Sequence, residues 1–288
     1  MCSLPRHPSA HERVEGPDAI RFESSEPVNQ STETLAGDGH PAEGPYWARS
    51  RRPLAILIFL LPFVLFYELS LLLIPMSSGR LDIVAYQGIE RIFGTLFGVV
   101  GLADAGMAIP AILLVVCLLA WHVMARHPWR LDGPTVPLMW LESSLVAVPV
   151  VVLGFVISLT PAMNTVGEEI AGMAPEAHPG ILSLLSMAVG AGLYEELIFR
   201  WVLIAMVHTL LADLLKFSNR TAIVSAVLLS SFLFTYAHHP GDLGAVAFYF
   251  LAGLWFSALY LIRGFGIAAG GHIAYDLVWV TWNLPQGG

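Results

Sequence analysis

Ionisable side chains that could do chemistry lie inside long apolar stretches of this chain, in three groups. In chain order they are Glu195, Glu196, Arg200, His238, His272 and Asp276. A charged group inside a bilayer is costly unless it is paired or faces a polar cavity. The pattern therefore predicts that these side chains face a shared polar site and not lipid.

Helix geometry gives the two adjacent glutamates different positions. Residues four apart share a helix face, whereas neighbours point about 100° apart. Glu196 and Arg200 are therefore predicted to form an ion pair, and Glu195 needs a different partner. A carboxylate in an apolar setting can act as a general base near neutral pH. The alternative, a purely architectural pair of Glu196 and Arg200, leaves Glu195 unexplained.

The two histidines belong to later apolar runs. Glu195 and His238 lie 21 residues before and 22 residues after Lys216. If Lys216 lies in the turn between two antiparallel helices, the two side chains reach a similar depth. His272 and Asp276 are four apart, so they are predicted to share a helix face and to point into the same cavity. For Asp276 the alternative is a residue that only orients a buried histidine.

The three groups together resemble the CPBP (Abi) family, the CAAX-protease and bacteriocin-processing group of intramembrane glutamic endopeptidases. The family pattern is EExxxR, then FxxxH, then HxxxN or HxxxD, on successive transmembrane helices. Here the second motif runs from Phe234 to His238, and the resemblance covers about 181–283. It implies a peptidase without a nucleophilic side chain, in which Glu195 activates a water.

The resemblance also implies roles for the other candidate residues. His238 would help to hold the water, and His272 with Asp276 would stabilise the oxyanion. Glu196 and Arg200 would maintain the geometry and charge balance of the site. An ionised Asp276 can only accept hydrogen bonds, whereas an Asn can donate. Asp276 must therefore be protonated, or must act by holding His272 as the donor.

The composition excludes several classes of protein. Of 288 residues, 56% are hydrophobic and 12% are charged, against a usual charged share of about 25%. The mean hydropathy is +0.69 and the net charge is −8. These values argue against a soluble domain and a nucleic-acid-binding protein. They predict an all-α, polytopic transmembrane helix bundle, because open backbone groups find no partners in lipid.

The apolar runs predict about seven spans, with eight possible. A helix needs roughly 20 residues to cross the hydrocarbon core. Segment 81–102 carries three charged residues and is predicted either to lie along the interface or to form an extra span. The long run 181–212 is predicted to tilt, protrude or bend near Gly190 and Gly192. The seven runs are 53–75, 106–125, 138–160, 181–212, 221–238, 243–262 and 265–283.

The chain is predicted to consist of a disordered polar tail, 1–46, and a membrane domain, 47–288. With seven spans, one set of basic residues near span ends falls on one side: Arg49, Arg51, Arg52, Arg126, Arg130, Lys216, Arg220 and Arg263. The loop 161–180, which lacks Lys and Arg, falls on the other side. The positive-inside rule then predicts a multi-pass protein of the cell membrane with a cytoplasmic N-terminus. An eighth span at 81–102 would reverse the later loops.

Two functions are compatible with this predicted bundle. The first is an intramembrane peptidase that cuts a membrane-associated, lipidated or sorted protein near the membrane surface. The second is a non-catalytic immunity, resistance or peptide-binding protein that uses the same polar cavity. No cofactor is predicted, although Glu195, His238, His272 and Asp276 offer ligands that zinc accepts. The expected partners are a peptide or protein substrate with a membrane-proximal segment and the lipid bilayer.

Four other ionisable residues fall singly in apolar runs. They are predicted to be structural, interfacial or lumen-facing, and they are Glu68, His122, Glu142 and His208.

Overall fold

The protein is a helical bundle in all the parts that the structure describes. The computed structural model describes residues 44–73, 109–131, 133–159 and 180–283. Every regular element within these ranges is a helix, and they contain no strand. The predicted all-α fold is therefore confirmed. The segment 81–102, the loop 161–180 and nearly all of the tail 1–46 lie outside the described residues.

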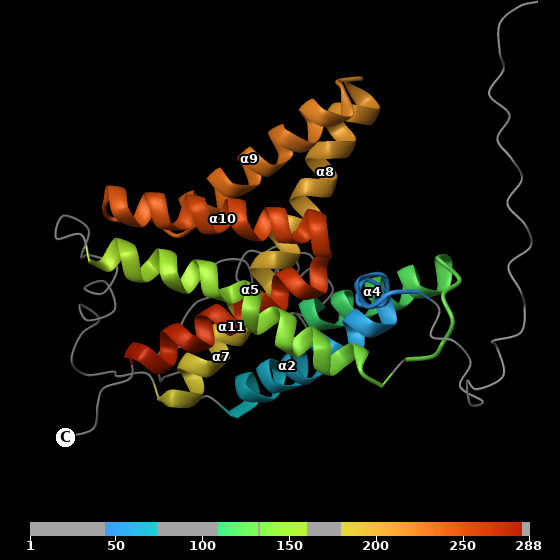
Figure 1. Ribbon diagram of the computed structural model, residues 1–288, viewed down its shortest axis with the longest axis horizontal. Coiled ribbons are helices and arrows are strands. Elements are labelled where there is room, and N and C mark those ends of the chain that lie inside the picture. The colour runs from blue at the N-terminus through green and yellow to red at the C-terminus, as the bar shows by residue number, and fades with distance from the viewer. Residues whose placement is uncertain (1–43, 74–108, 132, 160–179, 284–288) are drawn as a thin grey trace, which may run out of the picture. The chain divides into compact units, whose positions relative to one another are not determined.

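Helices occupy all seven apolar runs, after a short first helix, α1 (Tyr46–Arg49) (Figure 1). The fourth run is one continuous helical stretch made of four consecutive segments. In chain order the elements are α2 (Pro53–Leu73), α4 (Ile109–Met124), α5 (Thr135–Ser158), α7 (Ile181–Glu195), η3 (Glu196–Ile204), α8 (Ala205–His208), η4 (Thr209–Leu214), α9 (Asn219–Ala237), α10 (Leu243–Arg263) and α11 (Phe265–Asn283).

Five of the described helical stretches are long and apolar enough to cross a membrane. They are α2, α5, the stretch Ile181–Leu214, α9 and α10. Helix α4 is apolar but has only 16 residues. Helix α11 has 19 residues, but its polar positions include His272 and Asp276. The chain is therefore a multi-pass membrane protein, and the predicted count of seven is approximate. Its orientation stays a prediction.

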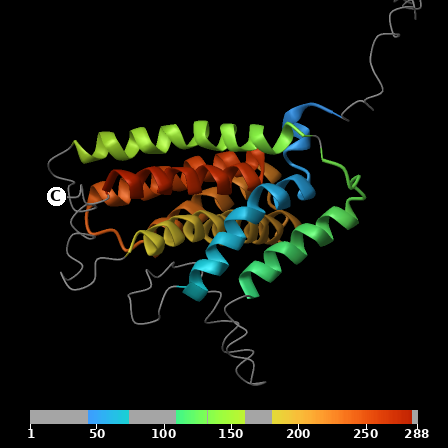
Figure 2. The ribbon, with the colours of Figure 1, turned by 90° about the horizontal axis from the view of Figure 1, so that it is seen from below.

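Helix α11 lies inside the bundle and packs most extensively against α5 and α7. Figure 2 shows α5 running alongside α11, with α2 crossing the bundle obliquely. Helices α9 and α10 form an antiparallel pair that also contacts α11 and η3. The residues from Phe265 to Ile273 are almost entirely buried, as expected for a helix surrounded by other helices.

A glycine allows α7 and α11 to approach closely. A Cβ atom at Gly192 would lie 2.5 Å from both the backbone N and the Cγ1 of Ile273. Small residues at such crossings are typical of helix packing in membranes. The sequence predicted a bend near Gly190 and Gly192. The structure shows Gly192 at a helix crossing, and regular α-helical geometry ends after Glu195. The bend itself stays a prediction.

Gly192→Ala is expected to destabilise the protein. Alanine is favoured over glycine in a helix by about 1 kcal/mol, but overpacking a core typically costs about 1–3 kcal/mol. The steric effect should dominate here, because one of the atoms that must shift is backbone. The midpoint of thermal unfolding in detergent measures the effect. Gly180→Ala is the control, since nothing lies within 4 Å of its added Cβ. Equal midpoints for the two variants would contradict the close approach.

The segments η3 and η4 have the i to i+5 hydrogen bonding of a π-helix. Such segments are rare and frequently occur at functional sites. Segment η3 begins at Glu196 and includes Arg200. The change in helical period thus coincides with the first group of ionisable residues.

A polar cluster ties α1 to α5 and α10. Arg263 forms a bidentate ion pair with Glu142, in which Nη2 donates to Oε2 over 2.8 Å. The Tyr46 hydroxyl donates to the same carboxylate at 2.6 Å. Arg263 also donates to the Ser50 hydroxyl and the Trp47 carbonyl. Burial, followed by the contact with Glu142, raises the pKa of Tyr46 well above its usual value. Glu142 is thus structural, with a partner 121 residues away.

Candidate active site

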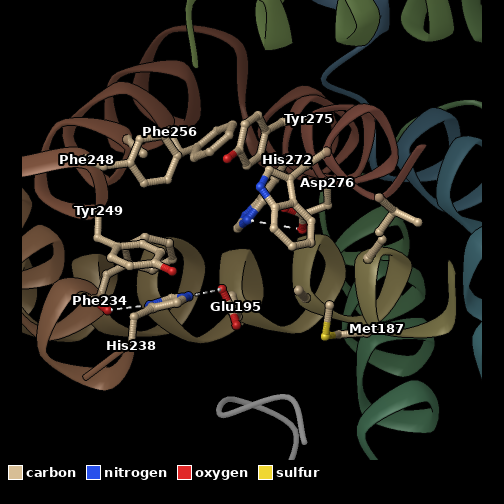
Figure 3. A pocket seen from close by; sticks show the side chains of 15 residues that line it. Met187, Glu195, Phe234, His238, Phe248, Tyr249, Phe256, His272, Tyr275 and Asp276 are labelled. Carbon is tan, nitrogen blue, oxygen red and sulfur yellow. Dashed lines mark hydrogen bonds and ion pairs between the residues drawn. The ribbon is translucent and has the colours of Figure 1, made fainter. Parts of the chain in front are cut away.

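Four of the predicted site residues line one cavity among α7, α9, α10 and α11. The cavity has a volume of about 290 Å³. Glu195, His238, His272 and Asp276 all contribute to its wall, and the rest of the lining is mainly aromatic and aliphatic (Figure 3). Three stretches that are far apart in the sequence therefore place these four side chains around one cavity.

Glu195 and His238 face one another across part of this cavity. Glu195 is the last residue of α7 and is only 3% exposed. Its Oε2 lies 3.5 Å from Nε2 of His238. That separation is longer than a good hydrogen bond of about 2.7–3.2 Å. Both atoms can therefore share a water molecule.

The end of α9 fixes the orientation of the His238 ring. Nδ1 of His238 lies 2.7 Å from the carbonyl oxygen of Phe234. A carbonyl oxygen only accepts, so Nδ1 carries a proton and donates it. Nε2 is thereby left to face Glu195. In the neutral ring this nitrogen is an acceptor, which suits the binding of a water hydrogen.

Aromatic rings hold His238 in place from two sides. Tyr249 of α10 stacks on the imidazole, with ring centroids 4.3 Å apart and planes inclined by 23°. The centroid of the Phe234 ring also lies 4.5 Å from that of the imidazole. The sequence reasoning did not identify Tyr249. The spacing of two aromatic residues was a usable signal in the sequence, because Tyr249 and Phe256 are seven apart and therefore share a face of α10. In the structure both residues line the cavity.

Glu196 lies behind the cavity wall, and its carboxylate contacts one residue of its own helical stretch and one residue of α11. Its Oε1 accepts a hydrogen bond of 2.8 Å from Nδ1 of His272. The same oxygen lies 3.1 Å from Nη1 of Arg200, and both residues of this ion pair are fully buried. The structure thus contains the predicted pair of Glu196 and Arg200. It adds a bond to His272, which lies 76 residues away.

Arg200 is held by charge and by an aromatic face. Its guanidinium lies 4.2 Å from the centroid of the Phe234 ring, a cation–π distance. None of its guanidinium nitrogens makes a hydrogen bond of good geometry to another described side chain. Removing the carboxylate of Glu196 would therefore deprive this buried cation of its ion-pair partner. Phe234 contacts both Arg200 and His238, which accounts for a phenylalanine four residues before the histidine.

His272 presents its second ring nitrogen to the cavity. Because Nδ1 donates to Glu196, Nε2 is free to face the cavity wall near Asp276, whose Oδ2 is 3.5 Å away. The His272 ring stacks on Phe256 with centroids 4.6 Å apart and planes inclined by 14°. Figure 3 shows His272 and Asp276 on the opposite side of the cavity from His238. Donors and acceptors thus surround a space that an amide group can enter.

The remaining ionisable residues of the apolar runs do not line this cavity. Glu68 accepts a hydrogen bond of 3.0 Å from the Tyr194 hydroxyl. His208 bonds to Asn219 over 2.6 Å. His122 is buried with its ring against Trp129, at a centroid distance of 4.3 Å.

The positions of the His, Asp and Glu side chains bear on the zinc alternative. Within the described ranges, no three His, Cys, Asp or Glu side chains are grouped so that they could hold one metal ion. Nδ1 of His272 is bonded to Glu196, and the two pairs that line the cavity are set on opposite sides. The arrangement of these donors does not favour a zinc site. A reaction without a cofactor stays a prediction.

Comparison with known proteins gives one family. Residues 177–278 match the family model described as Type II CAAX prenyl endopeptidase Rce1-like. No curated protein and no solved structure matches the chain. The matched segment begins just before α7 and ends within α11, so it contains all six predicted site residues. The family implies protease activity of the CAAX type within a membrane. The match of residues 177–278 to this family model agrees with the resemblance that the three motifs predicted.

Proposed function

We propose that this protein is a glutamic-type intramembrane endopeptidase in which Glu195 activates the attacking water. The observation that carries the proposal is the position of the Glu195 carboxylate. It is buried among apolar helices, faces His238 at 3.5 Å and shares a cavity with His272. A hydrolase needs a general base, a held water and a donor for the developing oxyanion. In the proposed mechanism Glu195 is the base, His238 helps to hold the water, and His272 is the donor to the oxyanion.

The proposed reaction begins with a water held between Glu195 and His238. Glu195 takes one proton from this water as its oxygen attacks the scissile carbonyl carbon. The resulting tetrahedral oxyanion accepts a hydrogen bond from Nε2 of His272, which carries a proton when the ring is an imidazolium stabilised by Glu196 and Asp276. When the C–N bond breaks, the proton on Glu195 passes to the leaving amine, so that the products are a carboxylic acid and an amine. No covalent enzyme intermediate forms.

The proposed substrate is a peptide or protein with a segment close to the membrane surface. The cavity lies within helices that cross the membrane, so a soluble substrate would have to leave water to reach it. Lipidated termini and sorting segments meet this condition. No metal or other cofactor is proposed for the reaction.

Asp276 is proposed to support His272 and the oxyanion. Asp276→Asn is expected to preserve cleavage, because the amide oxygen can still face His272 and the amide nitrogen can donate. Asp276→Leu should reduce cleavage by about 10²-fold, the typical loss for one oxyanion donor. Initial rates on an identified substrate measure both effects. An equal loss in the two variants would mean that a carboxylate itself is required.

The competing proposal is a non-catalytic protein that binds a peptide in the same cavity. A comparison of membrane proteomes from cells with the protein, without it and with Glu195→Gln separates the two. For a peptidase, a precursor protein should accumulate both in its absence and in the variant. A Glu195→Gln protein that retains its full biological effect, with no precursor accumulating, would favour binding over catalysis.

A further inference from the structure

A buried hydrogen bond links a side chain of α9 to the backbone of η3. The Ser230 hydroxyl donates to the carbonyl oxygen of Phe199 over 2.6 Å, and Ser230 is fully buried. Hydroxyls inside helices commonly bond to a carbonyl three or four residues back in their own helix, as Thr235 does in α9. Ser230 instead bonds to a different helical segment, four residues after Glu195. The bond thus fixes α9 to the backbone one turn beyond the proposed base.

Three residues on one face of α9 contact the helical stretch that continues from Glu195. Ser230, Phe234 and His238 are spaced by four residues, so they share this face. The Phe234 ring packs edge-on against the ring of Phe199, with centroids 5.4 Å apart. His238 faces Glu195, on the same side of the cavity as Phe234 (Figure 3). The hydroxyl, the ring and the imidazole thus follow one another towards the proposed water.

The three contacts differ in how strictly they fix the position of α9 along η3. Apolar contacts such as that between Phe234 and Phe199 have no preferred direction, so they tolerate sliding and rotation. The atoms of His238 and Glu195 are 3.5 Å apart, which is too long for a good hydrogen bond. The bond from Ser230 is short and directional, and losing a buried partner is costly. Of the three contacts, this bond is therefore the one that holds the register of α9.

We propose that Ser230 is a positioning residue that sets the depth of His238 against Glu195. The proposal rests on the proposed function, in which these two side chains hold the attacking water. Ser230 is not among the residues that line the cavity, so it acts through the helix and not on the substrate. The eight residues from Ser230 to His238 span about 12 Å of α9. A rigid helix carries a shift at one end to the other.

Two neighbouring serines provide a matched pair of variants. Ser230 and Ser231 are both fully buried in α9. The Ser231 hydroxyl makes no hydrogen bond to any residue that the structure describes. Ser230→Ala and Ser231→Ala therefore remove the same atom from adjacent positions, but only the first removes the bond to η3. Each is prepared in the full chain and measured well below its unfolding midpoint.

An engineered metal bridge measures the register without any substrate. Two nitrogens bound to one zinc ion lie roughly 3.3 Å apart, from Zn–N distances of about 2.0–2.1 Å in a tetrahedron. This matches the separation of Glu195 and His238, so Glu195→His should create a site for Zn²⁺. Adding Ser230→Ala should weaken Zn²⁺ binding by about tenfold, since losing a supporting hydrogen bond costs metal sites about 10–100-fold. Adding Ser231→Ala should leave it within about twofold. Titration calorimetry with Zn²⁺ alone gives the affinities.

Cleavage rates then connect the register to the reaction. The probe is a peptide with an S-farnesylated cysteine four residues from its carboxyl end, as the matched family suggests. Ser230→Ala, with Glu195 intact, should lower kcat by about tenfold, because misplacement by 1 Å can cost about 10²-fold. KM should stay within about twofold, since Ser230 does not reach the cavity. Ser231→Ala should leave both constants within about twofold.

Several results would overturn the proposal. Zn²⁺ that binds Glu195→His no better after His238→Ala is added would show that the two positions do not face each other. Equal Zn²⁺ affinities with and without Ser230→Ala, or an equal loss for Ser231→Ala, would show that the bond does not set the register. An unchanged kcat in Ser230→Ala beside an inactive Glu195→Gln would refute the positioning role and leave the proposed function standing. A weakened bridge beside a fully active Glu195→Gln would support the register and refute the proposed function.

Discussion

Glu195→Gln should reduce substrate cleavage by about 10³-fold without changing the amount of folded protein. An amide has nearly the same shape as the carboxylate but cannot take a proton from water, and general bases contribute about 10²–10⁴-fold. Position 195 is uncharged in the variant, but the ion pair between Arg200 and Glu196 stays intact. The loss should therefore appear in the rate and not in the unfolding midpoint.

The control for this variant is Glu68→Gln. It makes the same chemical change in the same bundle, and its amide oxygen can still accept the Tyr194 hydrogen bond. Cleavage by Glu68→Gln should match that of the wild type. A Glu195→Gln protein that is stable and cleaves at the normal rate would eliminate Glu195 as the base.

Glu196→Gln is expected to lower the stability of the folded protein more than the substitution of any other single glutamate. Arg200 is fully buried, and Glu196 supplies its carboxylate. Breaking such a buried pair by removing one partner typically costs about 3–5 kcal/mol. For a domain of this size that corresponds to a fall of roughly 10 °C in the unfolding midpoint. The measurement is thermal unfolding in detergent, alongside the abundance of the variant in membranes.

A second substitution separates charge from shape in this pair. Arg200→Met in the Glu196→Gln background removes the cation and keeps a long apolar side chain against Phe234. Replacing both partners of a buried pair is often far less harmful than removing one. The double variant should therefore unfold at a higher temperature than Glu196→Gln alone. A double variant that is less stable than both single variants would show that the two charges do not depend on each other.

The sequence could predict those parts of the site that depend on spacing along one helix. Glu196 with Arg200, and His272 with Asp276, are four apart, and the structure places each pair within 3.5 Å. The similar distance of Glu195 and His238 from Lys216 predicted a similar depth, which permits their contact. It holds because α9 runs antiparallel to the helical stretch before it, and Lys216 lies in the connection between them.

Contacts between helices that are not hairpin neighbours could not be predicted in this way. The bond from His272 to Glu196 depends on how α11 is rotated against η3, and a helix can rotate without any change in its apolar pattern. Even between the hairpin neighbours α9 and α10, the stacking of Tyr249 on His238 depends on how the two helices are rotated against each other. The π-helical period from Glu196 was not predicted either, because the residues of η3 other than Glu196 and Arg200 are all apolar and their spacing does not reveal a change of period.

The position of His272 has a consequence for the biosynthesis of this protein. Helix α11 is translated after α7, α9 and α10, yet it supplies His272, Asp276 and one wall of the cavity. A chain still on the ribosome without α11 has Glu195 and His238 but no donor from His272. Under the proposed mechanism, the nascent protein cannot hydrolyse its neighbours at the insertion site. Proteolytic competence would then arise only when α11 has docked between α5 and α7.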